Sequence, residues 1–160
     1  MDAVAARRTP LAPVVIALAI VTIAAVGGLA TDTTSAWYSA LDRPSFQPPG
    51  AVFGPVWTVL YLALGISTWI AWRDVAGPRR PVIVGLFVAN YALNLAWTMI
   101  FFQLHAPVAA GIEILSLLGT IVALIALLRG RHPAAAWLLA PYALWVGFAT
   151  VLTWTIAATN

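Results

Sequence analysis

Cysteine is absent from this chain of 160 residues, and charged side chains make up only 8% of it. Without a thiol there is no disulfide framework, no thiolate metal site and no cysteine nucleophile. Soluble domains carry roughly a quarter charged residues, whereas 62% of this chain is hydrophobic and its mean hydropathy is +0.95. The composition therefore argues against a water-soluble monomer.

Lysine is also absent, so every basic side chain except the two histidines is an arginine. The arginines form no basic patch with interleaved aromatics, which disfavours nucleic acid as a partner. In a model with five membrane spans, all but one fall on the side of the N-terminus: Arg7, Arg8, Arg73, Arg79, Arg80, Arg129 and Arg131. Only Arg43 falls opposite. The positive-inside rule then predicts a cytoplasmic N-terminus.

Five apolar stretches are each long enough to span hydrocarbon, which takes about 20 helical residues: 10–30, 53–73, 82–104, 108–128 and 134–157. Backbone groups in lipid must bond internally, and these continuous runs lack the alternation of barrel strands. The first run is too long for a signal-peptide core, although Arg7 and Arg8 precede it. We predict an all-α polytopic integral membrane protein, a bundle of five transmembrane helices forming a single domain over residues 1–160.

Prolines mark the expected helix ends. Pro55, Pro81, Pro107 and Pro133 are compatible with first-turn positions, where the missing N–H has no intrahelical partner in any case. Pro141 lies inside the fifth span and is expected to kink or loosen that helix. The loop 31–52 joins the first two spans, and its Pro-Pro pair makes it a stiff connector or a lid over the bundle.

Three of the predicted helices carry a stripe of aromatic and polar side chains. Residues three, four or seven apart share a helix face, and this spacing joins three groups: Trp57, Tyr61, Thr68 and Trp72; Asn90, Asn94, Trp97 and Phe101; Tyr142, Trp145, Ala149 and Thr153. Intramembrane polar groups face the bundle or a cavity. A shared pocket and hydrogen bonds between helices are both open for the two asparagines.

Tryptophans near span ends suit the interfacial belt, where an amphipathic indole is anchored. That reading applies to Trp37, Trp69, Trp72, Trp137 and Trp154. The remaining three, Trp57, Trp97 and Trp145, lie on the stripes and are candidates for contact with a planar ligand.

The sequence WYSALDRPSFQPPGAVFGPVWTVLY, residues 37–61, is similar to a signature of the translocator protein or tryptophan-rich sensory protein (TspO/MBR) family. The similarity continues through NYALNLAWTMIFF at 90–102 and PYALWVGFATVLT at 141–153. Members of this family are five-helix bundles, commonly homodimeric, that bind porphyrins and, in eukaryotes, cholesterol. Here the resemblance suggests a bacterial member, and the absence of barrel strands favours the inner (plasma) membrane.

The resemblance implies a porphyrin or haem ligand, with no required cofactor and no metal site, in a pocket formed by Trp57, Tyr61, Asn94, Trp97, Trp145 and Ala149. Residues Trp37, Pro44, Pro48 and Pro49 would belong to the lid loop. The function it implies first is a membrane tetrapyrrole-binding sensor or regulator. The alternatives are an enzyme that degrades porphyrin with light and oxygen through Trp57 and Trp145, and a transporter of porphyrins or other amphipathic molecules.

Several positions depart from the family pattern. Thr153 replaces a usual asparagine and Ala109 a frequent tryptophan, which leaves one pocket hydrogen bond and the shape of the cavity mouth open. The C-terminal sequence VLTWTIAATN lacks the basic residue of the proposed sterol motif.

Glu113 is the only acid inside a span, and we expect it in helix or oligomer contacts rather than at the ligand. His105 and His132 lie at span ends without partners at metal spacing.

Overall fold

The structure is a computed structural model that describes residues 11–160, and within that range it contains helices and connecting loops but no strand. The elements are α1 (Ala12–Ala30), α2 (Ala36–Ala40), α3 (Gly50–Asp74), the 3-10 turn η1 (Gly77–Arg79), α4 (Arg80–Thr98), the π-helical turn η2 (Met99–Gln103), α5 (Pro107–Leu128) and α6 (Pro133–Thr159). Five helices, with α4 and η2 counted as one, are long and apolar enough to cross a membrane. The predicted all-α bundle of five spans is confirmed.

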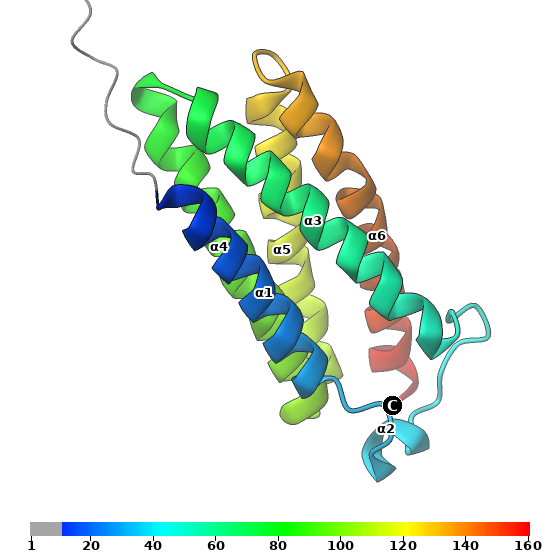
Figure 1. Cartoon of the computed structure of the whole chain (residues 1–160). Coiled ribbons are helices and arrows are strands. Elements are labelled where there is room, and N and C mark those ends of the chain that lie inside the picture. Colours follow the sequence, from blue (N-terminus) through cyan, green and yellow to red (C-terminus); the bar gives the residue numbers. More distant parts are fainter. Residues whose placement is uncertain (1–10) are drawn as a thin grey trace, which may run out of the picture.

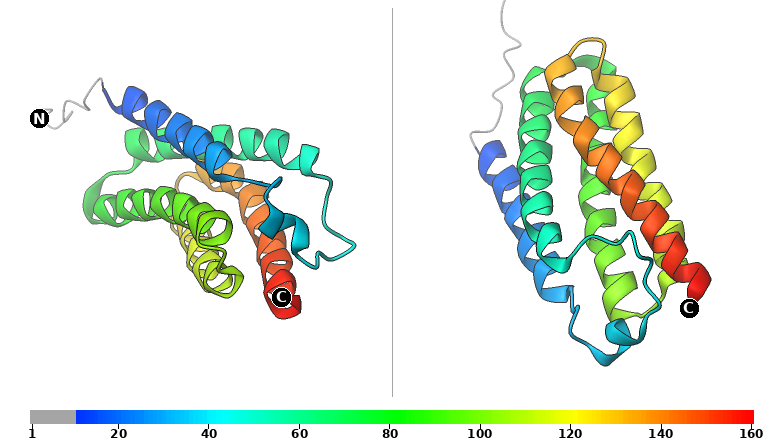
Figure 2. Two further views of the ribbon diagram at one scale, coloured as in Figure 1. Left: turned by 90° about the horizontal axis from the view of Figure 1, so that it is seen from below. Right: turned by 90° about the vertical axis from the view of Figure 1, so that its right-hand side faces the viewer.

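The five long helices lie side by side (Figure 1), and the contacts between neighbours form a closed ring. Helix α1 packs on α3 and α4, α3 packs on α6, α6 packs on α5, and α5 packs on α4. Helix α1 is the most weakly integrated member, with only Ala12, Ile23, Gly27 and Ala30 buried. The views in Figure 2 show it on the outside of the bundle.

Proline placement explains most helix starts. Pro81, Pro107 and Pro133 each lie in the first turn of their helices, as predicted. The prediction for Pro55 is wrong, because α3 begins at Gly50, after Pro49 as the N-cap, and so Pro55 lies in its second turn. Helix α6 continues through Pro141. Membrane helices tolerate such interior prolines where neighbouring groups satisfy the freed carbonyl.

The two ends of the bundle differ in charge. The connections between α3 and α4 and between α5 and α6 lie at one end, which carries five arginines: Arg73, Arg79, Arg80, Arg129 and Arg131. Arg43 belongs to the loop at the opposite end, where the C-terminus also lies (Figure 1). Arg7 and Arg8, used in the orientation prediction, and the first residue of the predicted span 10–30 lie outside the described residues.

The hydrophobic core fills the arginine-rich half of the bundle. It combines the C-terminal half of α3, the N-terminal half of α4, most of α5 and the first half of α6. Leu64, Ile121, Leu124, Leu128 and Leu139 are all completely buried there. A smaller cluster around Tyr38, Leu41 and Phe101 closes the other end. Between the two clusters the packing leaves a cavity.

Candidate functional site

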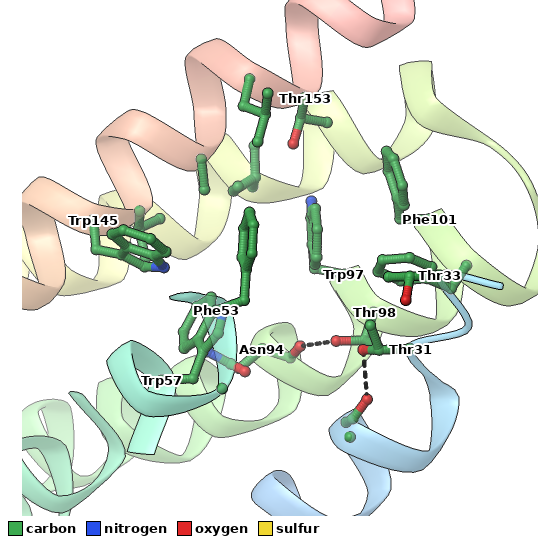
Figure 3. A pocket seen from close by; sticks show the side chains of 18 of the residues that line it. Thr31, Thr33, Phe53, Trp57, Asn94, Trp97, Thr98, Phe101, Trp145 and Thr153 are labelled. Atoms are coloured by element: carbon green, nitrogen blue, oxygen red, sulfur yellow. Dashed lines mark hydrogen bonds between the residues drawn. The ribbon is translucent and has the colours of Figure 1, made fainter. Parts of the chain in front are cut away.

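The cavity of about 430 Å³ lies in the half of the bundle nearest the loop between α1 and α3, and all five long helices contribute to its wall. Of the helices that cross the bundle, α3, α4 with η2, and α6 contribute aromatic and polar lining, whereas α1 and α5 contribute small and aliphatic residues. The lining that matters for recognition is Tyr61 together with Phe53, Trp57, Asn94, Trp97, Phe101, Trp145 and Thr153, which Figure 3 labels. Ligand pockets of small molecules span roughly 300–1,000 Å³, so this cavity is of ligand size.

The aromatic side chains form two facing walls. On one wall, Trp97 stacks on Phe101, with ring centroids 5.2 Å apart and an angle of 16° between the planes. On the other, Phe53 meets Trp145 edge to face at 5.8 Å, and Trp57 packs against Tyr61 at 5.2 Å. These contacts fix the rings in place. A cavity bounded by preset aromatic faces favours a flat, largely apolar molecule.

Two indole N–H groups in these walls lack hydrogen-bond partners. The Nε1 atoms of Trp97 and Trp145 are buried, and neither finds an acceptor among residues 11–160. In Figure 3 the Trp97 nitrogen points toward Thr153 of α6 and the Trp145 nitrogen toward Phe53, and both indoles line the cavity. A buried donor without an acceptor costs about 1–3 kcal/mol. An acceptor on a bound molecule would recover that loss.

The floor of the cavity is a hydrogen-bonded network across four helices. Tyr61 Oη donates to Asn94 Oδ1 at 2.7 Å, and Asn94 Nδ2 donates to Tyr142 Oη at 2.8 Å. Tyr142 Oη donates in turn to Asn90 Oδ1 at 3.3 Å, and Asn90 Nδ2 donates to Thr120 Oγ1 at 2.8 Å. Asn90 therefore joins helices, and Asn94 both joins helices and lines the cavity. The two readings left open by the sequence hold together.

The loop between α1 and α3 covers the end of the cavity. Trp37 stacks on His105 with centroids 4.3 Å apart and meets Phe101 edge to face at 5.6 Å. The backbone of Asp42 exchanges hydrogen bonds with Asn160: its N–H donates to Asn160 Oδ1 at 2.9 Å, and its carbonyl accepts from Asn160 Nδ2 at 3.2 Å. Phe46 packs edge to face on Phe148. Tyr38 also packs on Phe102 at 5.7 Å, so ring contacts and hydrogen bonds attach the loop to the bundle at several points.

Only part of this loop reaches the cavity itself. Thr31, Thr33, Tyr38 and Gln47 line it, whereas the residues predicted for the lid, Trp37, Pro44, Pro48 and Pro49, do not. Gln47 Nε2 donates to Tyr38 Oη at 3.0 Å, and the Gln47 Oε1 atom is buried without a partner among the described residues. The Arg43 guanidinium lies over the Tyr38 ring, 5.1 Å from its centroid. The rim therefore offers polar groups and one nearby positive charge.

All six residues predicted to bind a ligand, Trp57, Tyr61, Asn94, Trp97, Trp145 and Ala149, line this one cavity. The predicted stripes divide, however: Thr68 and Trp72 of α3 lie at a separate cavity near the arginine-rich end. Thr153 lines the aromatic cavity. Ala109 is exposed on α5 and does not line it.

Sequence reasoning missed the contributions of α1 and α5. Ala24, Gly27 and Gly28 of α1 and Ile114 and Leu117 of α5 complete the wall. Small and aliphatic residues are what any membrane helix contains, so they give no signal of their own. Phe53 was detectable, since it lies four residues before Trp57 on the same face.

Both histidines and Glu113 lie outside the aromatic cavity. Within residues 11–160 no three histidine, cysteine or acidic side chains gather as a metal site. His105 is stacked under Trp37 and His132 precedes α6 at the other end. Both carboxylate oxygens of Glu113 are buried without a partner among the described residues, and Glu113 lines neither of the two cavities described here.

The fold and the cavity define a multi-pass integral membrane protein with an internal aromatic chamber. The TspO/MBR family model matches residues 14–158, and the chain belongs to this family. It is 36% identical over 126 residues to the translocator protein of Homo sapiens, covering 78% of this chain and 75% of that protein. It is 33% identical over 144 residues to the tryptophan-rich protein TspO of Archaeoglobus fulgidus, covering 89% and 93%. The tryptophan-rich protein TspO of Bacillus cereus is 36% identical over 124 residues, covering 78% and 80%.

Proposed function

We propose that the aromatic cavity binds a tetrapyrrole, porphyrin or haem, and that the protein is a membrane sensor or regulator whose bundle responds to this ligand. The observation that carries the proposal is the pair of buried indole donors, Trp97 and Trp145, left without acceptors in facing aromatic walls. A tetrapyrrole has two flat π-faces for the rings and nitrogen and carboxylate acceptors for the N–H groups.

The rim supports the same ligand class. Propionate side chains of a porphyrin are anionic, and the mouth of the cavity carries Tyr38, Gln47 and the nearby Arg43. With the porphyrin ring between the two aromatic walls, its propionate groups would extend toward the polar rim of the cavity. The attached loop limits the conformational entropy lost on binding, because its position is largely set before the ligand arrives.

A light-driven, oxygen-dependent degradation of porphyrin is the second candidate, because Trp57 and Trp145 both lie in the cavity wall. An indole is oxidised by one electron more readily than other ring side chains lacking a hydroxyl, and excited porphyrin with dioxygen would supply the oxidant. This reaction differs from sensing in requiring loss of the porphyrin spectrum during turnover.

A protoporphyrin titration in darkness followed by illumination in air separates the two candidates. Trp145→Phe removes one N–H donor and should weaken dark binding about 2–10-fold, the equivalent of one hydrogen bond. Trp137→Phe is the matched control, because this tryptophan is 76% exposed on the same helix. Saturable binding with no protein-dependent bleaching supports the sensor. Bleaching that disappears in Trp145→Phe but not in Trp137→Phe supports the enzyme, and absence of saturable binding refutes both.

We also propose a homodimer. Small residues let helices approach closely, but Ala110 and Gly111 of α5 are buried within the chain, where Gly111 meets the Trp154 indole of α6. Ala89, Ala92 and Ala96 of α4 remain at least partly exposed and allow a second helix to approach closely. Ala92→Phe should dissociate the dimer in light scattering of the detergent-solubilised protein, and an unchanged dimer would contradict this face.

The orientation we propose places the arginine-rich end on the cytoplasmic side of a bacterial inner membrane, following the positive-inside rule. The chain has no cysteine, so single cysteines at Ser45 and Gly130 can each be labelled in whole cells with a membrane-impermeant maleimide. Labelling at Ser45 alone is expected. Labelling at Gly130 alone would reverse the orientation.

A further inference from the structure

A second cavity lies at the arginine-rich end of the bundle, between α1, α3 and α4. It measures about 410 Å³ and shares no lining residue with the aromatic cavity. Val15 and Val88 line it and are 61% and 62% exposed, so it opens on the outer surface of the bundle. We refer to it as the α1–α4 groove, lined by Ala12, Val15, Ile16, Ala19, Thr68, Ala71, Trp72, Val84, Phe87, Val88 and Tyr91.

The wall of this groove is almost wholly hydrocarbon. Its two hydroxyl groups satisfy each other, since Tyr91 Oη and Thr68 Oγ1 are 2.6 Å apart and Thr68 Oγ1 also donates to the Leu64 carbonyl. The exception is the Trp72 indole, whose buried Nε1 has no acceptor within residues 11–160. An occupant therefore needs an apolar body and one hydrogen-bond acceptor near Trp72.

Positive charge gathers beside that acceptor position. The Arg80 guanidinium lies over the Trp72 ring, 4.6 Å from its centroid, and Arg79 is exposed next to it. Arg73 is the exception, because its guanidinium makes two hydrogen bonds with the Asp74 carboxylate, at 2.7 and 3.0 Å. The end of the groove near Trp72 is thus suited to an anion.

The groove and the basic group at its end together span about one leaflet of a bilayer. On α4 the lining runs from Val84 to Tyr91, and Arg80 lies about one turn before it. From Arg80 to Tyr91 the helix rises about 16 Å at 1.5 Å per residue, which is close to half of the roughly 30 Å hydrocarbon core. The basic end lies where the helices leave the membrane, and the Thr68–Tyr91 end lies near the bilayer midplane.

We infer that the α1–α4 groove holds one acyl chain of an anionic phospholipid from the leaflet at the arginine-rich end, with its phosphate and ester oxygens at Arg80 and the Trp72 N–H. The inference is independent of the proposed tetrapyrrole site, which lies in the other half of the bundle. Such a lipid fills the space between the weakly integrated α1 and the rest of the ring.

The test is lipid retention by the full chain, purified in detergent, delipidated and incubated with phosphatidylglycerol or phosphatidylcholine of identical acyl chains. Native mass spectrometry counts the bound lipid. Ala19→Phe places a ring in the groove, and Ala17→Phe, exposed on the same helix, is its control. Wild type and Ala17→Phe should retain phosphatidylglycerol in preference to phosphatidylcholine. In Ala19→Phe the affinity for phosphatidylglycerol should fall about tenfold or more.

Two further variants test the head-group end and stand in for Ala19→Phe if it fails to fold. Arg80→Gln should reduce the preference for phosphatidylglycerol about fivefold, the effect of one arginine near an anionic lipid. Arg129→Gln, at the same end of the bundle, should leave it unchanged. Trp72→Phe should weaken retention of both lipids about 2–10-fold.

Three results would overturn the inference. One is equal retention by Ala19→Phe and Ala17→Phe. Another is an undiminished preference in Arg80→Gln. The third is loss of a dimer, rather than of lipid, in Ala19→Phe, which would assign the groove to a second copy of the chain.

Discussion

Removing the Tyr142 hydroxyl should destabilise the bundle through the network beneath the aromatic cavity. Tyr142 is completely buried, and its Oη accepts from Asn94 Nδ2 and donates to Asn90 Oδ1. In Tyr142→Phe the ring remains against Trp57, at the 6.2 Å edge contact, but two buried amide groups each lose a partner.

The magnitude follows from the number of groups left unpaired. An unsatisfied buried polar group costs about 1–3 kcal/mol in general, while interhelical hydrogen bonds in a membrane protein average about 0.6 kcal/mol with a maximum near 1.7. With two groups affected, we expect Tyr142→Phe to lower the free energy of unfolding by about 1–2 kcal/mol.

Tyr91→Phe is the matched control. It removes a hydroxyl bonded to Thr68 at 2.6 Å, yet Thr68 still donates to the Leu64 carbonyl, so no buried donor is left without an acceptor. We expect a loss of at most about 0.6 kcal/mol. Reversible unfolding in mixed micelles of detergent and SDS measures both variants. Equal losses would refute the reasoning that orphaned amides determine the cost.

The remaining predictions concern packing, the loop and the mouth of the cavity. Gly111→Ala places a Cβ 2.9 Å from the Trp154 indole and should lower the free energy of unfolding by about 1–3 kcal/mol. Its control, Gly119→Ala, has nothing within 4 Å and should leave that free energy unchanged or raise it by up to about 1 kcal/mol. The same unfolding assay compares the two variants, and equal effects would contradict the contact with Trp154. Hydrogen bonds from the Thr34 hydroxyl and amide hold the pKa of Asp32 below its ordinary value, so its stabilisation of the loop is present above the unfolded pKa and lost as the pH falls through the folded one. Asp32→Ala should therefore speed hydrogen exchange of the Thr34 amide at neutral pH. In the variant, the protection of this amide should no longer fall as Asp32 would be protonated. Unchanged protection would contradict the role of Asp32 in holding the loop. Arg43→Gln should weaken binding of protoporphyrin but not of its dimethyl ester, and equal weakening would contradict a role for Arg43 in holding the carboxylates.

The span pattern was predictable because its physical cause is local. A helix in lipid needs about 20 apolar residues, and prolines at 81, 107 and 133 mark three starts to within a residue. Pro55 misled because an interior proline and a first-turn proline look alike in sequence. The short α2 and the π-helical turn at 99–103 were not predicted, since five-residue elements have too few residues to show a period.

The candidate site was predictable where it is aromatic or polar. Helical spacing brought Trp57 and Tyr61, Asn94 and Trp97, and Trp145 and Ala149 to one cavity, as the structure places them. The same spacing also assigned Thr68 and Trp72 to that face, although they lie about two and three turns beyond Tyr61 on α3 and line the α1–α4 groove. The spacing of residues shows which face of a helix they share, but not which residues at different depths in the membrane belong to the same site. Two sites on one face of α3 were therefore predicted as one.

The hydrogen-bond partners of the asparagines were beyond sequence reasoning. Asn90 to Thr120 and Asn94 to Tyr142 join residues on different helices, and their meeting depends on the order of helices around the ring. That order is a property of the packed bundle, because each helix alone is apolar on most of its surface.

The most direct test of the central claim, that the aromatic cavity is a tetrapyrrole site, is dark protoporphyrin binding to Ala149→Phe and Val151→Phe. Ala149 lines the cavity, whereas Val151, two residues on in α6, is 58% exposed on its outer surface. If the tetrapyrrole lies in this cavity, wild type and Val151→Phe bind protoporphyrin saturably, whereas the affinity of Ala149→Phe falls at least about tenfold. Equal affinity in both variants would show that porphyrin binds elsewhere.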